Sequence, residues 1–125
     1  MSSRRILIVD DEDDIREVAQ VSLELVGQYE VLTAASGREG ILRARDLRPD
    51  AILLDVMMPD LDGPATLAEL QADPATRDIP VLFLTAKAQA AERTRLAQLG
   101  AAGILTKPFD PLTLPQEVAS ALRWN

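Results

Sequence analysis

The 125-residue chain contains neither cysteine nor histidine. Without cysteine, it can form no disulfide bond and no thiolate metal site. Without histidine, it lacks the usual zinc ligand, the usual general base and any phosphohistidine of its own. Metal binding or group transfer by this chain must therefore use carboxylates, hydroxyl groups, lysine side chains and the main chain.

Aromatic residues and positive charge are also scarce. Only 3% of the residues are aromatic, and the formal net charge is −7. Proteins that bind nucleic acid neutralise phosphates with Lys and Arg, and those that bind single strands stack bases on aromatic side chains. The composition therefore argues against direct binding of nucleic acid.

The sequence has no signal sequence and no apolar run of the roughly 20 residues that cross a membrane. We therefore expect a soluble, cytoplasmic protein without a membrane partner. Hydrophobic residues make up 47% of the chain, which supports a packed core and argues against disorder. A length of 125 residues fits one domain, residues 1–125.

Five short apolar runs alternate with longer segments, at residues 6–9, 29–34, 51–55, 81–85 and 103–106. Strands that are apolar throughout are typical of parallel sheets buried on both faces. The alternation predicts an α/β fold, a three-layer (βα)5 sandwich. We expect a flavodoxin-like, five-stranded parallel sheet in the order 2-1-3-4-5.

The segments between these runs show helical periodicity. The first predicts a helix over residues 13–26, with its apolar and small residues inward: Ile15, Val18, Ala19, Ser22, Leu25 and Val26. Ser36 and Glu39 form the capping-box pattern of a second helix, which we expect to end before Arg48. Asp62 is expected to cap a third helix, whose inward residues are Leu67, Ala68 and Leu70.

The fourth helix is expected over residues 89–99, with a thin apolar stripe. Pro115 would interrupt a helix that began at Pro111, because proline has no N–H to donate. We therefore expect the last helix to begin near Thr113, with Thr113 and Gln116 as a capping box and Pro115 in the first turn.

Polar residues stand at the carboxyl ends of four predicted strands, namely Asp10, Asp11, Asp55, Thr85 and Lys107. In a sheet of this order, ligands bind at that edge, near the switch point between strands one and three. Singly, each residue has an ordinary explanation as a helix cap, a strand residue or a solvated charge, and we interpret Glu12, Asp13 and Asp14 in that way. The set at one edge is better explained as a site.

Three clustered carboxylates repel one another and need a cation. With oxygen ligands alone, the candidates are Mg²⁺, Mn²⁺ and Ca²⁺, and Mg²⁺ most often shares its coordination shell with a phosphate. Asp55 is then the natural nucleophile, because a carboxylate can accept a phosphoryl group as an acyl phosphate. Lys107 would pair with that group, and Thr85 would donate a hydrogen bond to it.

Four motifs carry these residues in order along the chain: ILIVDDE, ILLDVMMPDLDG, PVLFLTA and GILTKPF. Together they resemble the response-regulator receiver domain of two-component signalling. The resemblance implies that a sensor histidine kinase or a histidine phosphotransfer protein phosphorylates Asp55. It also implies a signal through the fourth helix, fifth strand and fifth helix to a downstream effector or a fused output domain, and no enzyme activity beyond self-phosphorylation and autodephosphorylation.

The resemblance further implies a Mg²⁺ site. Asp11 and Asp55 would bind the metal, Asp10 would act largely through water, and the main-chain carbonyl of Met57 would complete the protein's share. The Lys107-Pro108 bond is expected to be cis, and Gly63 to supply backbone freedom after the phosphorylation site.

This chain departs from the family pattern in some places. Ile104 occupies a position where many members have Tyr or Phe that swings inward, and Ala102 replaces an acidic residue that DNA-binding subfamilies often carry. Met57 and Lys87, two positions after Asp55 and Thr85, occupy places that modulate how water reaches the acyl phosphate.

Three alternatives share parts of this pattern. A flavodoxin-type FMN carrier would need a hydroxyl- and glycine-rich loop after the first strand, where this chain has acids. A haloacid-dehalogenase-like phosphatase would need a second Asp at Met57. A pseudo-receiver that works without phosphorylation would not need the complete set of acids together with Thr85 and Lys107.

Overall fold

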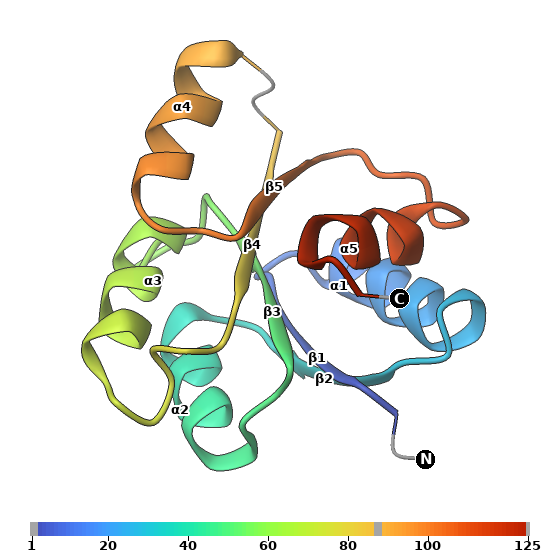
Figure 1. The fold of residues 1–125 in the computed structure, drawn as a ribbon, viewed down its shortest axis with the longest axis horizontal. Coiled ribbons are helices and arrows are strands. Elements are labelled where there is room, and N and C mark those ends of the chain that lie inside the picture. Colours follow the sequence, from blue (N-terminus) through green and yellow to red (C-terminus); the bar gives the residue numbers. More distant parts are fainter. Residues whose placement is uncertain (1–2, 87–88, 125) are drawn as a thin grey trace.

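The structure, a computed structural model, describes residues 3–86 and 89–124. Its strands are β1 (Arg5–Val9), β2 (Glu30–Ala34), β3 (Ala51–Asp55), β4 (Val81–Thr85) and β5 (Gly103–Thr106). Its helices are α1 (Asp13–Val21), the π-helical segment η1 (Ser22–Val26), α2 (Gly37–Leu47), α3 (Gly63–Ala72), α4 (Ala90–Gln98) and α5 (Leu114–Leu122). Strands and helices alternate along the chain (Figure 1).

The strands form one parallel sheet in the order β2-β1-β3-β4-β5, which confirms the predicted order. Val9 is in register with Leu54 of β3, and Asp55 with Leu84 of β4. The carboxyl ends of β1, β3 and β4 therefore lie next to one another, and the polar residues that follow these strands share one edge.

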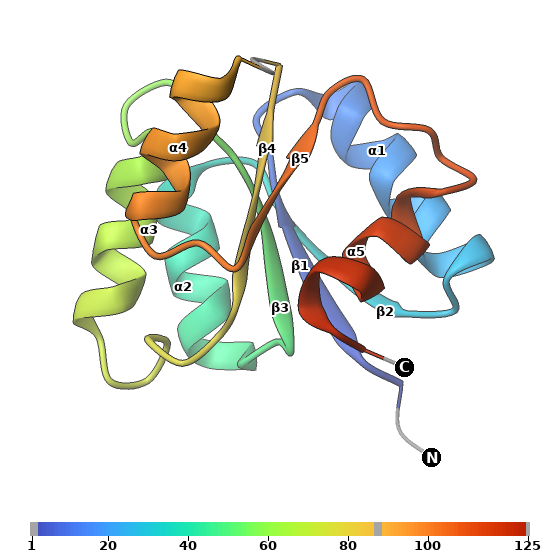
Figure 2. The same cartoon turned by 45° about the horizontal axis from the view of Figure 1, so that its top comes forward.

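Helices cover both faces of the sheet. α2, α3 and α4 lie on one side, and α1 and α5 lie on the other (Figure 2). Successive residues of each strand point to opposite faces of the sheet, so a hydrophobic core forms on each face. Leu7, Leu54 and Phe83 are fully buried toward the first group of helices, and Ile6, Ile8, Leu53, Leu82 and Leu84 toward the second.

The first helix differs from the prediction. Its α-helical part ends at Val21, and Ser22–Val26 continues it as a π-helix. Ala19, Ser22 and Leu23 are buried, but three residues predicted to face inward are exposed: Val18, Leu25 and Val26. The wider π-turn shifts the angular positions of the residues after Val21. Together with Val21 and Leu112, the three exposed residues form an apolar patch on the surface of α1, η1 and the β5–α5 loop.

α5 begins at Leu114, with Thr113 as the residue before it and Pro115 in the first turn, which confirms the predicted start. The predicted capping box does not form, because Thr113 has helical backbone angles and its side chain makes no capping hydrogen bond. The turn begins earlier, at Asp110, whose carbonyl accepts from the N–H of Leu114. Pro115 cannot donate to the carbonyl of Pro111, and the hydroxyl of Ser22 donates to that carbonyl instead.

The other helix starts are largely as predicted. The hydroxyl of Ser36 accepts from the N–H of Glu39, and the carboxylate of Asp62 accepts from the N–H of Ala65. In α3, however, Ala68 is exposed and Thr66 is buried. The buried hydroxyl of Thr66 is satisfied because it donates to the Asp62 carbonyl. Among the helices of the described residues, none is long and apolar enough to cross a membrane.

Candidate functional site

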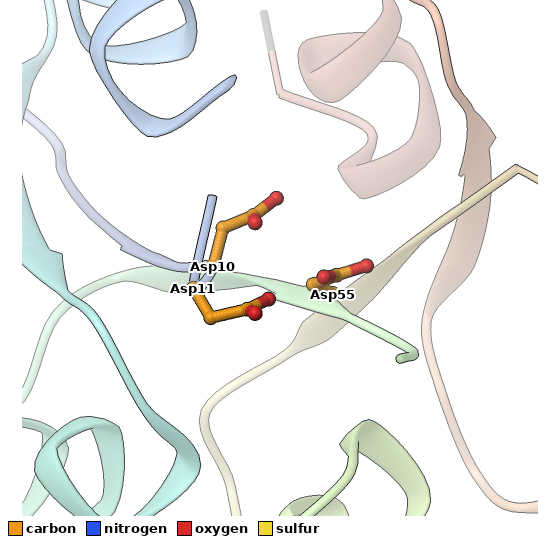
Figure 3. A group of neighbouring side chains, drawn as sticks. All are labelled: Asp10, Asp11 and Asp55. Carbon is orange, nitrogen blue, oxygen red and sulfur yellow. The ribbon is translucent and has the colours of Figure 1, made fainter. Parts of the chain in front are cut away.

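The three predicted acidic residues meet at the carboxyl edge of the sheet. Asp10 and Asp11 follow β1, and Asp55 ends β3 (Figure 3). Each offers one carboxylate oxygen, and these three oxygens lie within 4.8 Å of one another. The side chains of Asp10 and Asp55 are almost fully buried, with 0% and 4% of their residue surfaces exposed. Burying like charges so close together is unfavourable unless a cation compensates them.

One oxygen of this cluster lacks a hydrogen-bond partner among the described residues. It is Oδ1 of Asp11, which is buried. Buried polar atoms are nearly always satisfied, so an unsatisfied carboxylate oxygen beside two other carboxylates indicates a missing partner. An oxygen-only donor set of this kind fits a hard divalent cation such as Mg²⁺.

Within the part of the chain that the structure describes, Lys107 is the cation in contact with the cluster. It directly follows β5, and its main-chain N–H donates to the carbonyl of Thr85. Its Nζ atom lies 3.0 Å from Oδ2 of Asp10, 3.1 Å from Oδ1 of Asp55 and 3.5 Å from Glu12. Burial lowers the pKa of Lys107, but the short contacts with Asp10 and Asp55 outweigh it and raise the pKa above its usual value. The Lys107-Pro108 bond is cis, as expected.

The carboxyl group of Asp55 is the most strongly perturbed acid of the site. Its pKa is raised to about 6, first by burial and then by the negative charge of Asp10. Contacts with Lys107 and with the main chain of Met57 act in the opposite direction without cancelling the rise. A carboxylate with a raised pKa is more basic than usual, and this favours its reaction with an electrophile or its binding to a cation.

Thr85 and Met57 complete the predicted set. Thr85 is buried at the end of β4, and the side chain of Met57 is 70% exposed after β3. Both line a cavity of about 740 Å³ that also includes Asp55 and Lys107. The structure thus brings together all the residues predicted for the site, namely Asp10, Asp11, Asp55, Met57, Thr85 and Lys107. Lys87 lies outside the described residues.

Gly63 belongs to the site for a reason that the sequence did not reveal. The prediction was backbone freedom, but Gly63 does not have a positive φ angle. Its importance is close packing, because a Cβ atom there would lie 2.5 Å from the carbonyl oxygen of Asp55 and 2.8 Å from Cα of Val56. Its N–H also donates to the Val56 carbonyl at 2.9 Å.

Arg16 was not predicted to contribute. Its Nη1 atom donates to the main-chain carbonyl of Asp10 at 2.7 Å, and its Nη2 atom contacts Asp13 at 2.5 Å. The side chain is only 19% exposed. Arg16 therefore fixes the main chain that carries Asp10 and Asp11. The sequence offered one indication of an ion pair here, because Arg16 follows Asp13 by three residues on a predicted helix.

The family model of the response regulator receiver domain matches residues 6–119. This chain belongs to that family. The matched residues contain the five strands, apart from Arg5 at the start of β1, together with the acid cluster and Lys107. The chain is therefore a signalling domain of the receiver type, as the four sequence motifs predicted.

Relatives of this receiver domain include transcriptional regulators. The phosphate regulon transcriptional regulatory protein PhoB of Pseudomonas aeruginosa is 40% identical over 123 residues, which are 98% of this chain and 53% of that protein. The DNA-binding dual master transcriptional regulator RpaA of Synechocystis sp. is 41% identical over 119 residues, which are 95% of this chain and 49% of that protein. The chain thus spans about half the length of these curated relatives.

A solved structure agrees with this assignment over the full domain. The chemotaxis response regulator CheY4 of Vibrio cholerae superposes with a TM-score of 0.88 at 33% identity, covering 96% of this chain and 99% of that one. In the present receiver domain, Ile104 is partly buried and packs on the core beneath α2, α3 and α4, and Ala102 is exposed.

Proposed function

We propose that this receiver domain accepts a phosphoryl group on Asp55, with the help of Mg²⁺. The observation that carries the proposal is the acid cluster, in which a buried oxygen of Asp11 lacks a hydrogen-bond partner while Lys107 is shared between Asp10, at 3.0 Å, and Asp55, at 3.1 Å. Among the described residues, Lys107 is the one cation in direct contact with these carboxylates, which leaves room in the charge balance for a divalent ion.

Each site residue then has a role. A carboxylate oxygen of Asp55 attacks phosphorus, and the leaving group departs on the opposite side. Lys107 pairs with the phosphoryl oxygens, and the hydroxyl of Thr85 donates a hydrogen bond to one of them. Arg16 and Gly63 hold the main chain of Asp10 and Asp55 in position.

The metal would be held by Asp10, Asp11, Asp55 and the main-chain carbonyl of Met57, with Asp10 acting largely through water. When bound, Mg²⁺ supplies positive charge that offsets the negative charge of the incoming phosphoryl group, about −1.5 to −2. Mn²⁺ and Ca²⁺ offer similar oxygen chemistry and are expected to substitute for it.

The phosphorylated state is read on the surface formed by α4, β5 and α5. Thr85 precedes the loop that leads into α4, and Leu96 is the one buried residue of that helix. A helix with so few buried contacts can change position at low cost, so a phosphoryl group that engages Thr85 shifts an existing equilibrium. Ile104 has no ring to swing inward, so we assign the switch in this chain to Thr85 and α4 without an aromatic partner.

The donor is a sensor histidine kinase or a histidine phosphotransfer protein. Its histidine has to reach Asp55, so the donor must cover the surface next to the acid cluster. The helix that begins at Asp13, next to the acid cluster, carries an apolar patch of Val18, Val21, Leu25 and Val26 with the neighbouring Leu112, and these residues are 42% to 76% exposed. We assign it to the histidine-bearing helical surface of the donor.

The output is a downstream effector protein or a fused output domain, in keeping with relatives that are transcriptional regulators twice as long as this chain. We propose that residues 1–125 act as one receiver domain in the cytoplasm. Its only chemistry would be self-phosphorylation from a donor and autodephosphorylation, without turnover of an external substrate and without direct contact to nucleic acid.

Intact-mass measurement after incubation with Mg²⁺ and acetyl phosphate tests the proposal. We expect one phosphate adduct that requires Mg²⁺ and is lost in Asp55→Asn. Asp46→Asn, a change to an exposed acid on α2, is the matched control and should leave the adduct intact. Normal incorporation of phosphate into Asp55→Asn would refute the assignment.

A further inference from the structure

The cavity in front of Asp55 is larger than a phosphoryl group requires. Its volume of about 740 Å³ lies in the range of pockets that hold whole small molecules. Its lining includes Glu12, just before α1, Lys107, just after β5, and Glu92 and Arg95 of α4. α4 and α1 belong to the two opposite helical layers (Figure 2). A second cation, besides Lys107, therefore faces the space above Asp55.

Glu92 restrains this second cation. Nη2 of Arg95 lies 2.6 Å from Oε1 of Glu92, and the side chain of Glu92 is only 17% exposed while that of Arg95 is 52% exposed. The hydrogen bond to Glu92 and the charges of Glu92 and Asp62 raise the pKa of Arg95 above its usual value. Arg95 thus stands at the mouth of the cavity, charged and half in solvent.

Phosphoryl donors differ in the charge of the group that they release. In an in-line transfer, the leaving group lies on the side of phosphorus opposite the attacking Asp55 oxygen. It therefore points away from the floor of the cavity and toward its mouth. An acyl phosphate releases a carboxylate there, whereas a phosphoramidate or a phosphohistidine releases a neutral amine or imidazole. A guanidinium at the mouth stabilises the first leaving group and has little effect on the second.

We propose that Arg95 is a specificity-determining residue of the donor pocket, which favours acyl phosphates over nitrogen-linked phosphoryl donors, and that Glu92 limits this preference by binding Arg95. The inference rests on the proposed phosphorylation of Asp55. It adds a donor subsite on α4 to the residues already assigned to the reaction.

The step balances for both donor classes. With acetyl phosphate, a bond forms between Asp55 oxygen and phosphorus, the bond from phosphorus to the acetyl oxygen breaks, and acetate leaves with the electron pair. With phosphoramidate, the phosphorus–nitrogen bond breaks, and the nitrogen, already protonated in the donor, leaves as ammonia. Neither reaction needs an oxidant, a reductant or a further reactant.

The test is the ratio of two phosphorylation rates, measured by intact mass in the presence of Mg²⁺ with acetyl phosphate and with phosphoramidate. We expect Arg95→Gln to lower the acetyl phosphate to phosphoramidate ratio about fivefold, which is the order of effect that one charge exerts across a solvated pocket. Glu92→Gln should raise the same ratio. Arg93→Gln removes the same charge from an exposed position of α4 that does not line the cavity, and should leave the ratio unchanged.

The ratio separates this inference from the proposed function, because any general damage to the site affects both donors. Adducts with both donors but an unchanged ratio in Arg95→Gln would overturn the inference alone. An equal change in Arg93→Gln would overturn it as well, because the effect would then come from net charge. No adduct with either donor in the unmodified protein would overturn the proposed function, and this inference with it.

Discussion

The Nζ atom of Lys107 lies 3.1 Å from Oδ1 of Asp55, and the same ammonium group lies 3.0 Å from Asp10. One positive charge is thus shared by two buried carboxylates, with Asp11 beside them. The pairing is incomplete, and the pKa of Asp55 stays at about 6 in spite of it. The resting site therefore keeps an unfavourable excess of negative charge, which has a measurable effect on stability.

Asp55→Asn should stabilise the metal-free protein at neutral pH. The pKa of Asp55 rises from 3.8 to about 6 on folding, so the folded state binds more protons between these values and stability falls as pH rises through that window. At pH 7 the charged carboxylate costs about 2 to 3 kcal/mol, and Asn removes this cost. Urea unfolding should show the difference at pH 7 and its loss near pH 4.

Mg²⁺ provides the control for that experiment. It should stabilise the unmodified protein at pH 7 and have a much weaker effect on Asp55→Asn, because a ligand is lost. Equal stability of the two proteins at pH 7 without metal would contradict the charge argument.

Gly63→Ala should damage the metal site as well as the fold. Its new Cβ would lie 2.5 Å from the Asp55 carbonyl oxygen, a contact with main chain that cannot rotate away. We expect a loss of about 1 to 3 kcal/mol in unfolding free energy and a weaker Mg²⁺ affinity by titration. Gly40→Ala is the matched control, because its Cβ would meet the side chain of Val9, 2.8 Å away, and no main chain of the site. Gly40→Ala should therefore leave Mg²⁺ affinity unchanged, and equal losses of affinity in the two variants would contradict the argument.

The apolar patch should matter for protein donors alone. Leu25, 76% exposed on η1, is part of the surface that we assign to the donor. Leu25→Ser should slow phosphoryl transfer from a histidine phosphotransfer domain that phosphorylates the unmodified protein, by about tenfold for a central contact. Phosphorylation by acetyl phosphate should not change. Leu42→Ser changes a 57% exposed leucine on α2 and is the control. An equal effect in Leu42→Ser would contradict the assignment of the apolar patch to the donor.

The order of the sheet and the residues of the site could be predicted because each depends on a local pattern. Continuous apolar runs predict buried parallel strands, and the residue that follows each run is automatically at the carboxyl edge. Asp10, Asp55, Thr85 and Lys107 therefore met as expected.

The features that sequence reasoning missed depend on long-range packing. Helical spacing alone placed Leu25 inward, but the π-turn at Ser22–Val26 leaves it exposed. The role of Gly63 depends on main chain that only the folded loop brings near. Pro115 correctly predicted that α5 starts late, but not which group donates to the carbonyl that it leaves unpaired: that group is the hydroxyl of Ser22, 89 residues away from Pro111.

This last contact is open to a double-mutant test. Ser22 is 2% exposed, and its hydroxyl donates to the Pro111 carbonyl, which Pro115 cannot reach for lack of an N–H. Ser22→Ala should cost about 1 to 2 kcal/mol, because it leaves that carbonyl without a donor. Pro115→Ala supplies an N–H four residues after Pro111, so Ser22→Ala should cost less in that background. Urea unfolding of the two single variants and the double variant measures the coupling. Strictly additive losses would mean that the hydroxyl and the missing amide do not compete for the same carbonyl.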